Sequence, residues 1–309
     1  MSQYRIIEII DFEIKQIFDS VNVFTAIFNI TKSVPDKTYT LKSDLNVVKG
    51  IANADRDTFN TSNDIVAKLE KLDKFEQFLE VKDVGYNYWT EGRGKVRGDS
   101  IGSRVLYKGK KENTDDIGYI KGSDIERYFI KKPSNYLKHN YKKYLKDNDT
   151  FRFSPDILET KPKIVYRQTS STPIGAIDYD GVHNDKTVHN IISKTPPIDL
   201  RYVLAILNST LIKYYYKFVV GETGRAFAQV KTIYIKKLPF VNSADEIKLK
   251  LINLVDTLSS LSQEISKAKT PSEKEQIQNQ ATHIDKKIDE LVYKIYGIGE
   301  DEIKIIEEN

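Results

Sequence analysis

The sequence Thr270-Pro271-Ser272-Glu273 separates two long apolar stripes near the C-terminal end of the chain. Threonine can cap a helix, proline fits its first turn, and glutamate three residues after the cap completes a capping box. Apolar residues step by three or four over residues 249–265, and the same spacing returns over residues 277–295 before Gly297. The pattern predicts an antiparallel helical hairpin over residues 242–309.

A further helical pattern covers residues 200–220. Asp199 can cap its first turn and Gly221 can end it. The rest of the segment from residue 79 to residue 240 consists of short β-like runs separated by glycine turns. These runs, which predict a small mixed sheet, include residues 104–107, 118–120, 163–166 and 232–235.

The N-terminal region contains two segments in which apolar and polar residues alternate, residues 4–10 and 21–30. They flank a short stretch at residues 14–18, so we expect two strands around a short helix or turn. Two strands cannot bury both of their faces alone. This piece must therefore pack against the rest of the chain or against another chain.

Residues 33–60 are polar and irregular, which predicts a linker. Apolar residues then recur at helical spacing and predict an amphipathic helix over residues 65–78, capped by Ser62 or Asn63. The apolar face of this helix comprises Ile65, Leu69, Leu72 and Phe75.

Charge is distributed unevenly along the chain. The 48 Lys and Arg residues exceed the 44 Asp and Glu residues by four, yet residues 242–309 carry a net charge of −5 and residues 1–241 a net charge of +9. Three segments, 81–111, 121–147 and 213–237, each carry +5. A basic body joined to an acidic tail is typical of a protein that meets a polyanion. The alternative is a solvated, lysine-rich surface.

Composition excludes several kinds of site. The chain has no cysteine, which rules out disulfides, thiolate metal sites and cysteine nucleophiles. None of its four histidines has metal-ligand spacing, and the neighbours His183 and His189 are expected in a surface loop. No segment approaches 18 apolar residues, and the first residues do not resemble a signal peptide. We therefore expect a soluble, cytoplasmic chain without membrane partners.

Residues Asp156, Glu159 and Lys161 reproduce the letters of a PD-(D/E)xK nuclease motif. In that chemistry the two carboxylates lie on neighbouring strands and share a Mg²⁺ ion. The two residues between Asp156 and Glu159 leave no room for the chain to turn and pair with itself. A Mg²⁺-dependent nuclease is therefore the alternative, although the short distance between Asp156 and Glu159 in the sequence argues against it.

The segment Gly92-Arg93-Gly94-Lys95-Val96-Arg97-Gly98 is glycine-rich and basic. It does not match a nucleotide-binding G-x-G-x-x-G motif. It follows three aromatic residues, Tyr86, Tyr88 and Trp89, and basic side chains interleaved with aromatic ones can contact phosphates and bases. An ordinary exposed turn is the alternative.

A second candidate contact segment is the loop at residues 221–231, which contains Arg225, Gln229 and Lys231. Arginine reads guanine and glutamine reads adenine in the major groove. The three tyrosines at positions 214–216 just before this loop are expected in the core or at an interface.

Three segments together resemble one family. Ile120-Lys121-Gly122-Ser123-Asp124-Ile125-Glu126-Arg127-Tyr128 is similar to a G-x-D-I-x-R-Y element, and Lys161-Pro162-Lys163-Ile164-Val165-Tyr166-Arg167-Gln168 to a KPKIxYR strand. Tyr202-Val203-Leu204-Ala205-Ile206-Leu207-Asn208-Ser209, with Lys237-Leu238-Pro239-Phe240 downstream, is similar to an LLGLLNS…LP element. In this order they resemble the TaqI-like C-terminal specificity domain, the target-recognition part of adenine-specific DNA methyltransferases and type IIG restriction–modification enzymes.

The two ends of the chain extend the resemblance. Residues 3–32 resemble the last strands of a methyltransferase domain, and residues 288–297 resemble the end of the same polypeptides. The chain has neither the Asn-Pro-Pro-Tyr or Asp-Pro-Pro-Tyr motif nor the glycine-rich S-adenosylmethionine loop of that family. No catalytic residue can therefore be carried over. The resemblance implies no cofactor in this chain, with S-adenosylmethionine bound only by an upstream or partner catalytic domain.

We thus expect an α+β fold in four parts. Residues 1–33 resemble a methyltransferase remnant, residues 34–80 form a linker and a helix, residues 81–241 form the target-recognition domain, and residues 242–309 form the hairpin. Asp124 and Arg127 are expected to be structural, either paired with each other or capping a turn, and Gly122 to be a turn residue.

The resemblance implies sequence-specific recognition of double-stranded DNA on behalf of a methyltransferase or restriction catalytic domain or subunit. The alternative is a protein-interaction module that uses the hairpin, through which the chain could also self-associate. The residues expected to contact DNA are Tyr86, Tyr88, Trp89, Arg93, Lys95, Arg97, Arg104, Lys108, Lys110, Arg167, Arg225, Gln229 and Lys231.

Overall fold

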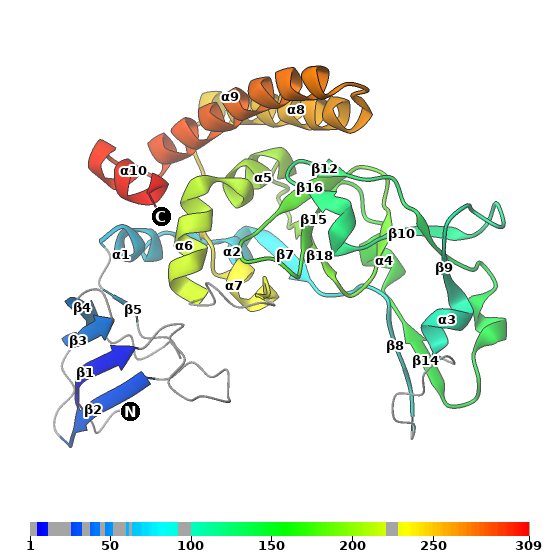
Figure 1. Ribbon diagram of the computed structural model, residues 1–309, viewed down its shortest axis with the longest axis horizontal. Helices are drawn as coiled ribbons and strands as arrows, with labels where there is room; N and C mark the ends of the chain where they lie inside the picture. Colours follow the sequence, from blue (N-terminus) through cyan, green and yellow to red (C-terminus); the bar gives the residue numbers. More distant parts are fainter. Residues whose placement is uncertain are drawn as a thin grey trace.

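The computed structural model combines an N-terminal sheet, a mixed α+β body and C-terminal helices (Figure 1). This arrangement confirms the predicted α+β class. The structure describes residues 5–11, 26–32, 38–43, 47–51, 60–61, 64–91, 100–220 and 228–308.

The N-terminal sheet contains the two predicted strands, β1 (Arg5–Asp11) and β2 (Ala26–Thr31), as an antiparallel pair. The prediction that residues 33–60 are irregular is wrong, because β3 (Thr38–Ser43), β4 (Val47–Ile51) and β5 (Asn60–Thr61) extend the sheet in the order β2-β1-β3-β4-β5. Strand β3 pairs in parallel with β1, so a non-local contact defines it, and its short polar sequence alone did not reveal it. The stretch at residues 14–18 lies outside the described residues.

The helix predicted over residues 65–78 is interrupted. Helix α1 (Asp64–Glu70) ends before the two-residue strand β6 (Asp73–Lys74), and a short helix α2 (Phe75–Phe78) follows. The interruption arises because β6 pairs with β19 (Pro239–Phe240) from the far end of the body. Three of the predicted apolar positions, Ile65, Leu69 and Phe75, are buried, and Leu72 packs against the core at its edge.

The centre of the body is a four-stranded antiparallel sheet in the order β16-β15-β18-β7. Its strands are β7 (Leu79–Lys82), β15 (Lys163–Arg167), β16 (Gly175–Asp178) and β18 (Val188–Ser193). The helix predicted at residues 200–220 packs against this sheet as two helices, α5 (Leu200–Asn208) and α6 (Thr210–Val220), with extended backbone at Ser209. The Asp199 side chain accepts from the Arg201 amide at 2.9 Å, which confirms the predicted cap.

A smaller lobe extends from one end of this sheet. It contains a second four-stranded sheet in the order β17-β10-β13-β9 and a two-stranded ribbon of β8 and β14. The strands are β8 (Asn87–Thr90), β9 (Leu106–Lys108), β10 (Ile117–Ile120), β13 (Asn135–Leu137), β14 (Asp149–Arg152) and β17 (His183–Asn184), and the short strands β11 (Ile125–Glu126) and β12 (Phe129–Ile130) pair beside the central sheet. The helical turns here are α3 (Ile101–Val105), η1 (Gly122–Asp124), η2 (Tyr141–Tyr144) and α4 (Pro155–Leu158).

Three local predictions in the body need correction. Residues 104–107 are the end of α3 and the start of β9, and residues 232–235 belong to helix α7 (Thr232–Lys236). His183 and His189 are buried on strands β17 and β18 and do not lie in a surface loop. In each case strand pairing or burial against distant segments overrides the local sequence pattern.

The predicted antiparallel hairpin is confirmed as α8 (Asp245–Lys267) and α9 (Pro271–Ile295). The Thr270 hydroxyl accepts from the Glu273 amide at 3.2 Å, and Gly297, with φ of 63°, lies beyond the end of α9. An additional helix, α10 (Glu300–Glu307), follows. The apolar stripe of the hairpin packs into the same core as α5 and α6, so the tail and the body share one hydrophobic cluster.

Polar contacts also join the hairpin to the body. Arg127 donates to both carboxylate oxygens of Asp285 on α9, at 2.5 and 2.9 Å, and to the carbonyl oxygen of Asn208 at 2.6 Å. Asp289, one turn further along α9, accepts from the amide and the hydroxyl of Thr210 at 2.7 and 2.6 Å. Arg127 is thus structural as expected, but its partner is Asp285, whereas Asp124 accepts from the Lys121 amide in the turn.

Candidate nucleic-acid interface

The β8–β14 ribbon extends away from the body on the side opposite the hairpin (Figure 1). Its register pairs Thr90 with Asp149 and Asn87 with Arg152. The inner face of the ribbon is packed through Phe151, whose ring lies 5.3 Å from that of the buried Tyr86 and 5.2 Å from that of Tyr141. Tyr88 stacks on Phe151 at 5.7 Å but remains 39% exposed. The ribbon is therefore supported from one side only.

The base of the ribbon is anchored by a buried carboxylate, Asp149. Its side chain accepts from the Thr90 hydroxyl at 2.6 Å and from Arg104 at 2.6 Å. Burial opposes ionisation of this carboxyl, but the hydrogen bonds from Thr90, the Lys146 amide and Arg104 outweigh it and lower its pKa to about 2. Arg104, which also donates to the Tyr144 carbonyl oxygen, is therefore engaged in holding α3 against the ribbon.

A cavity of about 380 Å³ opens where the ribbon meets the second sheet of the lobe. It has aromatic walls and a cationic rim. The Lys121 ammonium lies 5.8 Å from the centre of the Tyr119 ring. The residues that carry this character are Tyr88, Tyr107, Lys108, Tyr119, Lys121 and Lys186.

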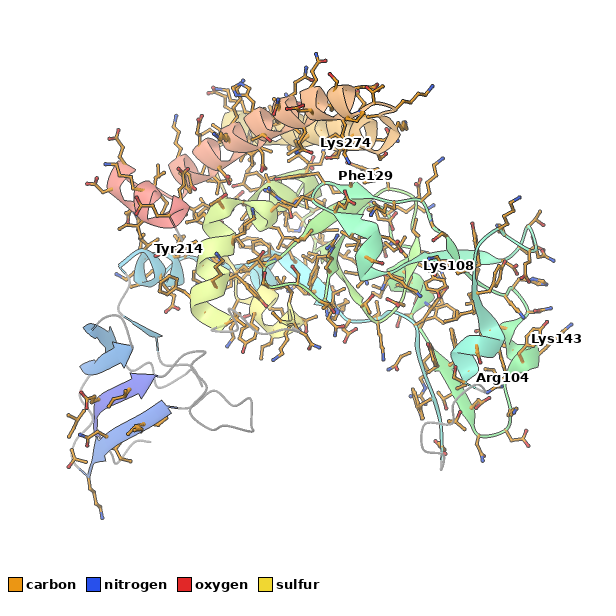
Figure 2. The ribbon with its side chains drawn as sticks, viewed as in Figure 1. Arg104, Lys108, Phe129, Lys143, Tyr214 and Lys274 are labelled. Atoms are coloured by element: carbon orange, nitrogen blue, oxygen red, sulfur yellow. The ribbon has the colours of Figure 1, made fainter. Side chains whose placement is uncertain are left out.

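Unpaired cations surround the same lobe. The side chains of Lys108 and Lys110 on and after β9, and of Lys142 and Lys143 in η2, are exposed. Within the described parts of the chain these four ammonium groups make no ion pair. Figure 2 shows Lys108 and Lys143 in this lobe and Lys274 on the distant hairpin. The lobe can therefore attract an anionic partner.

Tyr86 supports this lobe from inside. It is fully buried, and its hydroxyl lies 2.9 Å from Nδ1 of His183. His183 in turn approaches Glu159 at 3.3 Å, and burial lowers the pKa of the imidazole. Tyr86 therefore packs the aromatic core with Phe151 and Phe153, and we omit it from the contact surface proposed below.

Comparison with known proteins identifies part of this body. Residues 118–240, which include most of β10 and all of β14, β15, β18, α5 and α6, match the TaqI-like C-terminal specificity domain. The segment is thus similar to a TaqI-like specificity domain. The match contains Lys121, Lys186 and the whole of β14, whereas β8 and β9 precede it.

Two longer proteins resemble the chain. It is 28% identical over 202 residues to a Methanocaldococcus jannaschii protein named as a type II restriction enzyme and methyltransferase. Its fold also resembles that of MmeI, a type IIL restriction–modification enzyme solved in complex with DNA, with a TM-score of 0.55 at 9% identity. These similarities cover 63% and 99% of this chain, which spans 16% of the archaeal protein and 45% of the MmeI chain.

Other residues expected to contact DNA lie elsewhere in the specificity domain. Arg167 donates to the Ile125 carbonyl oxygen at 2.5 Å and lines a separate crevice against α8 and α9. Gln229 and Lys231 precede α7, where the Gln229 carbonyl oxygen accepts from Tyr216 at 3.2 Å. Tyr214, Tyr215 and Tyr216 are buried, as predicted. Arg93, Lys95, Arg97 and Arg225 lie outside the described residues.

The sequence-based search missed Arg152, Tyr107, Lys121 and Lys186. Arg152 has an available signal, since Phe151 and Phe153 alternate with Thr150 and Arg152 along one strand. This alternation places the polar pair on the face away from the core. The cavity residues come from strands that are distant in sequence, and no local pattern joins them.

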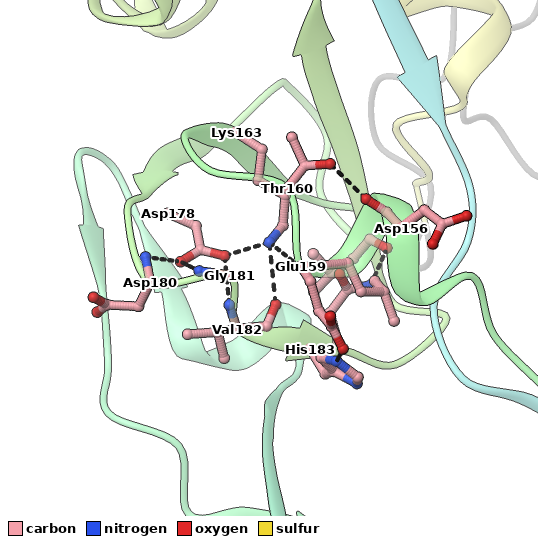
Figure 3. Close-up of polar contacts among 12 residues, drawn as sticks. Asp156, Glu159, Thr160, Lys163, Asp178, Asp180, Gly181, Val182 and His183 are labelled. Atoms are coloured by element: carbon pink, nitrogen blue, oxygen red, sulfur yellow. Dashed lines mark hydrogen bonds and ion pairs between the residues drawn. The ribbon is translucent and has the colours of Figure 1, made fainter.

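The nuclease alternative is not supported by the geometry around α4 (Figure 3). Glu159 is largely exposed and approaches His183, while Asp156 offers its backbone carbonyl to the Thr160 hydroxyl at 2.6 Å. Among the described residues, no group of three acidic, histidine or cysteine side chains could hold a metal ion. The buried cation here is Lys163, which donates to Asp178 at 2.5 Å and thereby stabilises a turn.

In the parts of the chain that the structure describes, no helix has the length and apolar character required to cross a membrane.

Proposed function

We propose that this chain recognises double-stranded DNA in a sequence-specific manner. In this proposal it is the specificity part of an adenine-specific DNA methyltransferase or of a type IIG restriction–modification enzyme. The observation that supports it best is a projecting lobe that lies partly within the segment matching the TaqI-like specificity domain. In the described parts of the chain, this lobe has cations without ion pairs beside exposed aromatic side chains. That MmeI was solved with DNA agrees with the proposal.

Different parts of the surface would have different tasks. Lys108, Lys110, Lys142 and Lys143 would neutralise phosphates, which supplies affinity on any sequence and makes it dependent on salt. Side chains of the ribbon and of the segment before α7 would enter a groove, where the base edges carry sequence information. The residues proposed for base contact are Tyr88, Trp89, Gln229 and Lys231, together with Arg93, Lys95, Arg97 and Arg225.

The catalytic part would be a methyltransferase domain or subunit that binds S-adenosylmethionine. In this proposal our chain contributes target recognition and leaves methyl transfer to that part. The hairpin, fixed to the body by Arg127 and Thr210, would hold the specificity domain at a constant angle. The stripe that suggested a protein-interaction module is used within the chain, so no observation favours that alternative.

The test is fluorescence-anisotropy binding of the chain to random duplex DNA between 50 and 300 mM salt. We expect a log–log slope of several units, because each neutralised phosphate contributes about 0.9. Selection of preferred sequences from a randomised duplex pool would then reveal a target motif. A flat salt response together with no selected motif would refute the proposal.

A further inference from the structure

The outer face of the β8–β14 ribbon carries a row of polar and aromatic side chains. Phe151 packs inward against the buried Tyr86, and its cross-strand partner Tyr88 shares that face. Successive side chains on a strand point to opposite faces, so the neighbours of this pair point outward. The outward residues are Asn87, Trp89, Thr150 and Arg152. Trp89 is 38% exposed even though it is a large apolar side chain.

Arg152 differs from the other arginines of the body. Five arginines lie between residues 100 and 220, all of which the structure describes. Four of them donate to protein oxygens: Arg104 to Asp149, Arg127 to Asp285, Arg167 to a carbonyl, and Arg201 to Asp199 and Asp256. Among the described residues, the Arg152 side chain alone of these five makes neither a hydrogen bond nor an ion pair, and the residue is exposed, so its guanidinium donors face solvent.

Its guanidinium group is nevertheless held in place. The centre of the group lies 5.1 Å from the centre of the Trp89 ring, within the range of a cation–π interaction. Stacking on an aromatic ring orients the planar guanidinium and leaves its N–H groups available to a second partner. An arginine that is oriented in this way on a projecting ribbon can donate two parallel hydrogen bonds. Its ligand would present two adjacent acceptors in one plane.

We propose that the β8–β14 ribbon enters the major groove of the target DNA and that Arg152 reads a guanine there. This inference rests on the proposed function. A major groove about 12 Å wide admits a two-stranded ribbon, and arginine bonded to O6 and N7 of guanine is the commonest specific contact. Four residues at about 3.4 Å each give a ribbon about 14 Å long, which is enough to reach the floor of a groove about 8.5 Å deep. Trp89 is a positioning residue for Arg152.

The experiment is selection of target sequences from a randomised duplex pool, using the full chain and its variants Arg152→Ala, Arg152→Lys and Lys274→Ala. Affinities are then measured on the selected duplex and on all its single base-pair substitutions. We expect the wild type to require G·C at one position that Arg152→Ala no longer discriminates, a loss of about 5- to 150-fold. Arg152→Lys keeps the positive charge but lacks the planar pair of N–H donors that arginine presents to guanine. This variant should bind random DNA with wild-type affinity and lose the preference for G·C at that position.

Lys274→Ala removes a cation from the exposed start of α9 and should change neither affinity nor preference. All three variants should melt close to the wild-type temperature, since the substituted side chains make no hydrogen bond in the described structure and Arg152→Ala gives up only an exposed contact with the Trp89 ring. If Arg152→Ala weakens every sequence equally, Arg152 contacts a phosphate and the inference is wrong. If even the wild type selects no motif, the proposed function itself fails.

Discussion

Removal of Asp285 should weaken the junction between the hairpin and the body. In an Asp285→Ala variant, Arg127 loses two hydrogen bonds and its counter-charge while it stays mostly covered, since the paired side chains are only 27% and 23% exposed. Breaking a fully buried pair costs about 3–5 kcal/mol and breaking an exposed one under about 1 kcal/mol. We expect a decrease in the free energy of unfolding of about 2–3 kcal/mol. Asp289 lies one turn away on α9 and carries the same negative charge as Asp285. It still attracts Arg127 in the variant, which keeps the loss of unfolding free energy below the upper limit.

The matched control is Asp256→Ala, which removes an acid of α8 that also pairs with an arginine of the body. Its partner Arg201 keeps two bonds to Asp199, and the Asp256 side chain is 48% exposed. This variant should lose less than about 1 kcal/mol. Urea unfolding followed by far-ultraviolet circular dichroism measures both values by linear extrapolation. Equal losses, or a loss below 1 kcal/mol for Asp285→Ala, would refute the reasoning.

Three further predictions concern the body of the molecule. The double variant Lys108→Ala/Lys110→Ala should bind all duplexes more weakly and lower the salt slope by about 2, and an unchanged slope in the anisotropy titration would exclude phosphate contacts. Asp149 has a folded-state pKa lowered to about 2, so its contribution to stability is present above pH 4 and disappears as the pH falls toward 2; Asp149→Asn should remove that part of the pH dependence in urea titrations. Asn208 exchanges two buried hydrogen bonds with the Gly175 backbone, at 2.9 and 3.0 Å, and Asn208→Ala should cost about 2–4 kcal/mol of unfolding free energy, while a loss below 1 kcal/mol would contradict this view.

Local signals predicted the elements that depend on local contacts. Thr270, Pro271 and Glu273 specify the start of α9 within one turn of the chain, and Asp199 does the same for α5. These predictions succeeded because capping involves neighbours in sequence. The same reasoning failed at residues 71–74, where pairing with β19 replaces a continuous helix, and at residues 232–235, where a β-like sequence forms α7.

The candidate site was predictable only in part. Aromatic and basic letters drew attention to Tyr88 and Trp89, which are exposed on the ribbon, but also to Tyr86, which is buried. Composition cannot distinguish Tyr86 from Tyr88, which alternation places on the same face. Their exposure differs because Tyr86 lies at the base of the ribbon inside the aromatic cluster of the lobe, whereas Tyr88 lies further out along β8. Arg104 and Arg152 carry the same charge in the sequence. The structure shows that Arg104 forms an ion pair with Asp149.

The contacts of the central sheet and of α9 set the unit that could be exchanged between proteins of different specificity. A transplant of residues 118–240 alone would remove strand β7 from the edge of its sheet and leave Arg127 and Thr210 without their acidic partners on α9. Joining at residue 79 would also remove β6, which pairs with β19, and the core residues Ile65, Leu69 and Phe75. The smallest self-sufficient graft therefore runs from α1 through α10, and chimaeras should be joined before residue 64 and after residue 308.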